Sequence, residues 1–293
     1  MMRLLFPLAA LVFGLGASLF PVRAAHAQDM INNLPDYTSA WVMGDLMQRR
    51  GKQRKDKSRR DRQDEERKVE QPDTKVAAKP PSPDPETILH QGTYAPSPMV
   101  EATLDDAFAG FLAGQRPDAS SPGLLRALAA DNPAGSPFLD LLADGLGGGD
   151  RGALRAALRR GELQQGYAQW LSSMGYTERN LFDVHAAFLM HTWAIANNGV
   201  MTRDSKAAFA AVREELVALQ AREDAPRTLS RSDARKQEEA QSFALLTALL
   251  VSAWDGADAR EKIVLRDGVN ALGRRIGIDY AAVALTGDGF QSR

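Results

Sequence analysis

The chain has 293 residues, with 36 Lys or Arg against 37 Asp or Glu, and it contains no cysteine. This near balance of charge argues against a dedicated nucleic-acid binder. The lack of cysteine excludes disulfides, a thiolate metal site and a cysteine nucleophile. The fold must therefore be held together by a hydrophobic core.

Residues 1–27 predict a cleavable secretory signal. Arg3 gives a positive start, an apolar run follows over 4–20, and Ala25-His26-Ala27 supplies the small residues that a signal peptidase requires. Cleavage after Ala27 leaves Gln28 first and predicts a periplasmic or secreted protein. The alternative is an uncleaved anchor, because the 19 residues of 4–22 are long enough to span a bilayer.

A low-complexity arm is expected between the signal and the folded domain. Residues 28–48 form a short apolar segment, and 49–70 hold 11 Lys or Arg against 6 Asp or Glu. The prolines that follow complete a linker over 49–92, which we expect to be disordered because it holds few apolar residues. The charged run predicts either weak contact with an anionic surface or a solvated spacer, and its interleaved acidic residues favour the spacer.

Residues 93–293 predict one compact all-α domain of six to eight helices. Apolar residues recur at helical spacing in this part, and alternating β patterns are nearly absent. The expected helical pieces are, in chain order, one opened by Ser97-Pro98, pieces over 122–130, 137–144, 151–160 and 162–174, helices over 178–196, from Thr202 to before Pro226, from Ser230 to Gly256 and over 258–276, and a short piece over 279–285.

The helix expected over 178–196 is the most apolar of the chain. Thr177 is the predicted N-cap, and Phe182, Leu189 and Trp193 fall on its core face. Ser230 and Asp233 resemble a capping box, with Asp in place of Glu.

Three histidines would remain after cleavage, and they do not form a metal site. His90 lies in the linker, whereas His185 and His191 are six residues apart on one helix and therefore point to different faces. A zinc pair on a helix needs a spacing of four. Two packed histidines are the favoured interpretation, and we expect no bound metal.

The carboxylates are weak catalytic candidates. Three adjacent pairs diverge by 100° on a helix and cannot converge on a substrate, namely Asp105-Asp106, Glu214-Glu215 and Glu238-Glu239. Asp183 lies near a helix start, which suits a charge beside the helix dipole or a buried hydrogen bond better than acid catalysis. Neither a serine-nucleophile motif nor a phosphate-binding loop occurs, so we expect no cofactor.

Several short motifs resemble the core of a family of exported bacterial helical proteins, a domain of unknown function. They are Met174-Gly175-Tyr176-Thr177, Asn180-Leu181-Phe182-Asp183, Ala186-Ala187, Trp193 and Asn197-Asn198-Gly199. The resemblance covers about 93–290 and implies an exported helical domain with no assigned activity.

Two functions remain open at this point. The first is a non-enzymatic module that binds an unknown protein partner in the cell envelope. The second is a hydrolase of envelope glycans or peptides that uses a lone carboxylate or histidine, with Asp183 and His185 as its catalytic candidates. Exposure of these side chains in a cleft would favour the hydrolase, and a closed core around both would favour the binding module.

Overall fold

The computed structural model describes residues 84–147, 150–199, 205–221 and 231–293. All of them belong to residues 37–293, one of the two compact units into which the chain divides. The predicted signal (1–27), the apolar segment (28–48), the charged run (49–70) and most of the proline-rich stretch lie outside the described residues.

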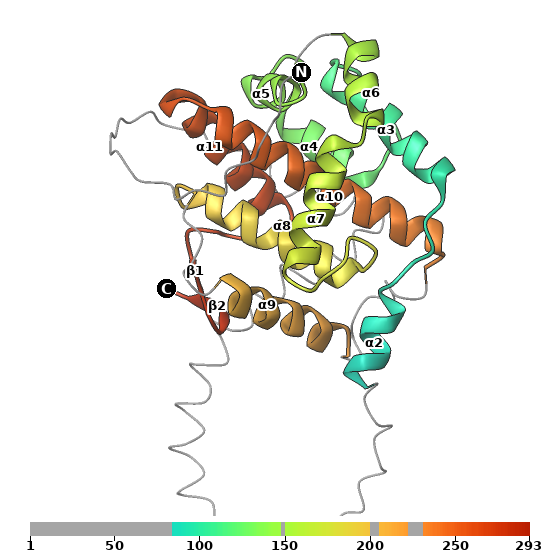
Figure 1. Cartoon of the computed structure of the whole chain (residues 1–293). Coiled ribbons are helices and arrows are strands. Elements are labelled where there is room, and N and C mark those ends of the chain that lie inside the picture. Colours follow the sequence, from blue (N-terminus) through green and yellow to red (C-terminus); the bar gives the residue numbers. More distant parts are fainter. Residues whose placement is uncertain (1–83, 148–149, 200–204, 222–230) are drawn as a thin grey trace, which may run out of the picture. The chain divides into compact units, whose positions relative to one another are not determined.

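The described residues form helices and one short hairpin, which confirms the all-α class (Figure 1). Within these residues no helix has both the length and the hydropathy that crossing a membrane requires. The elements are α2 (Pro85–Gln91), α3 (Pro98–Leu112), α4 (Gly123–Asp131), α5 (Pro137–Asp144), α6 (Arg151–Arg159), α7 (Glu162–Ser173), α8 (Leu181–Ala196), α9 (Ser205–Gln220), α10 (Asp233–Gly256), α11 (Ala259–Arg275), β1 (Val283–Thr286) and β2 (Gly289–Ser292).

Local sequence signals explain where many of these helices begin. The side chain of Ser136 accepts a hydrogen bond from Leu139 N at the start of α5, where Pro137 occupies the first turn. Asp150 caps α6 in the same way, through Ala153 N at 2.9 Å. Asp258 and Glu261 form a full capping box on α11.

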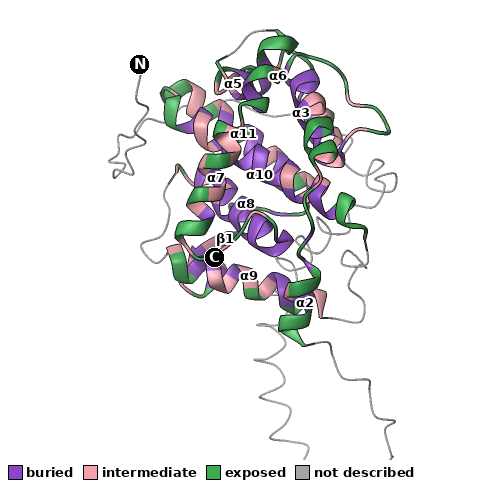
Figure 2. Ribbon diagram, turned by 45° about the vertical axis from the view of Figure 1, so that its right-hand side comes forward, coloured by how far each residue is buried: buried purple, intermediate pink, exposed green. Residues whose placement is uncertain are grey.

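The core is built around α8, whose residues are buried on nearly every face (Figure 2). The predicted core residues Phe182, Leu189 and Trp193 are all buried. Helix α8 packs against α10, α9 and α11, and α10 also packs against α7, α3 and α5. A helix enclosed from several sides needs apolar residues all round, which explains why its sequence is the most apolar of the chain.

The linker predicted over 49–92 extends too far toward the C-terminus, because its residues 85–91 form helix α2. Asp84 caps α2 through Thr87 N, and Ile88 is buried. Helix α2 packs against α9, and Asn180 Nδ2 donates to Leu89 O at 2.8 Å. One buried isoleucine and these long-range contacts stabilise a helix that its polar, proline-containing sequence alone did not predict.

The start of α8 also differs from the prediction. The helix begins at Leu181, and its N-cap is Asn180, which accepts from Phe182 N at 2.9 Å. Thr177 instead belongs to the preceding loop, where its backbone N–H donates to Asp183 Oδ2. The N-cap of α10 is Ser232, without a side-chain cap bond, and Ser230 lies outside the described residues.

The short helix expected over 279–285 is wrong, because these residues lead into an antiparallel hairpin. Strand β1 pairs with β2, and Thr286 lies opposite Gly289, which has a φ of 85° that favours glycine. The carbonyl of Val283 accepts a hydrogen bond from Trp193 Nε1 at 3.0 Å. Contacts with α8 and α9 therefore override the weak helical pattern of this segment.

Candidate functional site

Asp183, the first catalytic candidate, is enclosed in the first turn of α8 and is only 2 % exposed. Its two carboxylate oxygens accept from different donors: Oδ2 from Thr177 N at 2.9 Å and Oδ1 from Arg213 Nε. Burial raises the pKa of this carboxyl, and the Thr177 hydrogen bond and the charge of Arg213 oppose that rise. The carboxylate is therefore engaged by the protein itself.

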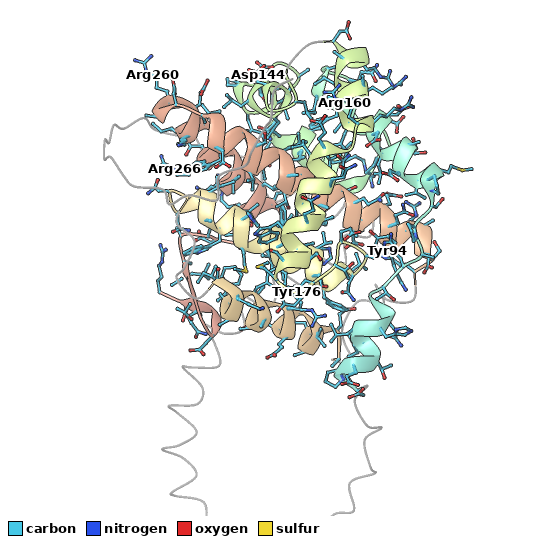
Figure 3. All side chains as sticks on the ribbon, in the orientation of Figure 1. Tyr94, Asp144, Arg160, Tyr176, Arg260 and Arg266 are labelled. Atoms are coloured by element: carbon cyan, nitrogen blue, oxygen red, sulfur yellow. The ribbon has the colours of Figure 1, made fainter. Side chains whose placement is uncertain are left out.

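Arg213 extends from α9 to Asp183, and its guanidinium also contacts the aromatic ring of Tyr176. Its guanidinium carbon lies 5.3 Å from the centroid of Tyr176, in the loop between α7 and α8 (Figure 3). Tyr176 in turn stacks on Phe209 of α9, with ring centroids 4.2 Å apart. The ion pair to Asp183 and the contact with Tyr176 together fix the orientation of the guanidinium.

His185, the second catalytic candidate, faces α10 and is 5 % exposed. Its Nε2 lies 3.2 Å from Glu239 Oε1, off the direction of a good hydrogen bond, and its ring packs edge-on against Phe243. Glu239 also accepts from Arg231 at 2.8 Å. His185 thus belongs to a buried polar contact between α8 and α10.

His191 faces a different neighbour, as its spacing from His185 predicted. Its Nδ1 lies 2.8 Å from the carbonyl of Ala187, which only accepts, so Nδ1 carries the proton. Burial lowers the pKa of His191 and favours the neutral ring. The edge of this ring packs on Trp170 of α7 at 4.6 Å between centroids.

The adjacent carboxylate pairs diverge as expected. Asp106 contacts Arg155 and Arg159 of α6, whereas Asp105 is buried, and its burial together with the charge of Glu101 raises its pKa to about 6. Glu238 pairs with Arg235. Neither Asp105-Asp106 nor Glu238-Glu239 converges on a shared position.

The described ranges contain no group of three or more His, Asp or Glu that could hold a metal ion. They do contain one buried polar atom near Asp183 that lacks a partner, the hydroxyl of Tyr167. Burial, reinforced by the charge of Asp183, raises the pKa of this hydroxyl well above its usual value. Asp183 and Arg213, with Tyr176 and the hydroxyl of Tyr167 nearby, therefore form a polar cluster at the start of α8.

Arg213 and Tyr176 were not singled out as site residues from the sequence. Arg213 follows Phe209 by four residues on α9, so the two share a helix face. A carboxylate in the most apolar helix needs a cation partner once it is buried. Asp183 in this apolar sequence was therefore the signal that could have predicted an ion pair with an arginine or a lysine. The sequence did not show which of its many arginines fills that place.

No protein-family model matches the chain, and no curated protein or solved structure is significantly similar to it. The resemblance to a family of exported helical proteins therefore stays a prediction. The site has to be interpreted from its own residues.

Proposed function

We propose that the protein is a non-enzymatic exported module that binds a protein partner in the cell envelope. The observation that carries the proposal is the enclosure of both catalytic candidates, with Asp183 at 2 % and His185 at 5 % exposure. A hydrolase needs its acid or base within hydrogen-bond reach of a substrate. Here the oxygens of Asp183 accept from Thr177 and Arg213, and His185 lies between Glu239 and Phe243.

Export is supported by the sequence of residues 1–27. The charged run 49–70 would serve as a solvated spacer, with weak contact with an anionic surface as the alternative. N-terminal sequencing of the protein from an envelope fraction tests the export. Gln28 as the first residue is expected. An intact Met1 on membrane-bound material would contradict the cleavage.

Thermal melts of two variants separate the binding module from the hydrolase. Asp183→Asn leaves one oxygen for two donors, and this should lower stability by about 1–3 kcal/mol. His185→Gln loses the contacts with Glu239 and Phe243 and should also lower the melting temperature. A fall of several degrees is expected for each, at about 2–4 °C per kcal/mol for a domain of this size.

Matched controls are His90→Gln and Asp267→Asn, both at exposed positions. Neither control should change the melting temperature measurably. Catalytic residues often destabilise the fold they serve. Unchanged or raised melting temperatures for Asp183→Asn and His185→Gln would therefore favour the hydrolase and contradict the proposal.

A further inference from the structure

Arg213 has donors that no residue described by the structure uses. Its Nε binds Asp183, but neither Nη group makes a hydrogen bond to any residue in the described part of the chain. A quarter of the side-chain surface is exposed. Since neither Nη atom is both buried and unpartnered, these donors reach solvent.

The guanidinium is already oriented before any ligand arrives. The buried carboxylate of Asp183 holds it through Nε, and its central carbon lies over the ring of Tyr176, which stacks on Phe209. An arginine held in this way loses little side-chain entropy when it binds. Its two Nη groups present parallel N–H donors, the arrangement that a carboxylate accepts in a bidentate manner.

Two half-buried aromatic rings lie on this part of α9, and one of them, Tyr176, contacts the guanidinium of Arg213. Trp170 and Tyr176 both contact Phe209, at centroid distances of 6.2 Å and 4.2 Å, so they flank the same part of α9. Both rings keep part of their surface exposed. Aromatic side chains and arginine are the residues most enriched at the centres of protein interfaces.

The charges around Arg213 favour a ligand with a single negative charge. Asp183 neutralises Arg213, and Glu178 in the loop before α8 is paired with Arg179. The exposed Glu214 next to Arg213 adds one negative charge. A phosphate or a polyanion would meet this acidic surrounding with two or more charges of the same sign. One carboxylate can use the free N–H pair with the least repulsion.

We propose that the surface formed by Trp170, Tyr176 and Arg213, hereafter the Arg213 surface, binds a single carboxylate that a segment of the protein partner carries beside an apolar side chain. The inference rests on the proposed function and names the chemistry of its partner. The apolar neighbour packs on Trp170 and Tyr176, and the carboxylate accepts from the Nη groups. Asp183 is a positioning residue for Arg213.

The test uses the full mature chain and three small probes that share a phenyl ring. They are 3-phenylpropionate, its neutral amide 3-phenylpropanamide, and phenyl phosphate. NMR titrations follow the side-chain N–H signals of Arg213 and the backbone amides around Tyr176. The carboxylate should bind about fivefold more tightly than the amide, the difference between a charge-assisted and a neutral hydrogen bond.

Variants locate the binding on the Arg213 surface. Tyr176→Leu keeps the ion pair between Asp183 and Arg213 but removes the aromatic ring that the guanidinium contacts, and should weaken 3-phenylpropionate several-fold. Arg213→Lys keeps the charge but loses the paired donors, and should reduce the preference for the carboxylate. Arg179→Gln is the matched control, since this arginine is 60 % exposed and lies in the same loop.

Each other outcome overturns the inference. Equal binding of the amide would show an apolar surface without carboxylate recognition, and tighter binding of phenyl phosphate would show an anion site of another kind. No shift of the Arg213 signals in the wild-type chain would exclude the surface, whatever the variants do. If the probes fail while Asp183→Asn and His185→Gln still lower the melting temperature, this inference fails and the proposed function stands.

Discussion

Replacing Trp193 by alanine should be among the most destabilising single changes in the described domain. The indole is 7 % exposed, and its Nε1 donates to Val283 O at 3.0 Å. Removing a packed aromatic costs about 3–5 kcal/mol, and the lost hydrogen bond leaves a carbonyl of β1 to find a new partner. At about 2–4 °C per kcal/mol, the melting temperature should fall by roughly 10 °C or more.

Urea unfolding followed by far-UV circular dichroism measures the free energy of unfolding of this variant. Trp193→Phe serves as a graded control, because it keeps most of the packing and loses the N–H donor. It should cost less than the alanine variant and should speed amide exchange within the β1–β2 hairpin. A Trp193→Ala protein with wild-type stability would refute the assignment of Trp193 to the core.

Two further changes follow from packing and burial. A Cβ on Gly268 of α11 would lie 2.2 Å from the ring of Phe138, so Gly268→Ala should cost about 1–3 kcal/mol. A Cβ on Gly166 of α7 meets no atom within 4 Å, so Gly166→Ala should stabilise by about 0.5–1 kcal/mol. Urea unfolding compares the two variants, and equal effects would contradict the packing of α5 on α11. Asp105 has a pKa of about 6 in the folded state, above the usual carboxyl value, so folding favours its protonated form. The stability that this protonated carboxyl contributes is complete below about pH 4 and is lost as the pH rises through 6. Asp105→Asn should therefore gain stability relative to the wild type between pH 4 and pH 7, by about 1–2 kcal/mol after allowance for solvent screening, and a difference that does not change with pH would contradict the buried carboxyl.

Much of the helical architecture could be predicted from the sequence because its signals are local. Pro137 and Asp144 bound α5 as expected, and Asp150 caps α6. Where a tertiary contact decides the structure, the local pattern misled. Helix α2 depends on burying Ile88, and the residues from Val283 onward pair as strands although their sequence lacks a β pattern.

The candidate site was predictable only in part. The position of Asp183 at a helix start predicted either a charge beside the helix dipole or a buried hydrogen bond, and the structure shows the hydrogen bond. The spacing of six between His185 and His191 predicted that they have different neighbours. The identity of the partner was not predictable, since Arg213 is 30 residues away on another helix. Only the packing of α8 against α9 selects this arginine.

The coupling between Asp183 and Arg213 tests the central claim, that the buried carboxylate has a structural partner instead of a substrate. The measurement is the free energy of unfolding, in urea at pH 7, of the wild type, R213Q, D183N and the double variant. R213Q alone leaves the buried carboxylate without its cation and should cost about 3 kcal/mol.

In the D183N background the charge is absent, so the same R213Q change should cost about 1 kcal/mol or less, a coupling of about 2 kcal/mol. An equal cost of R213Q in both backgrounds would show that the two side chains do not stabilise each other. That result would contradict the account and leave Asp183 available for chemistry.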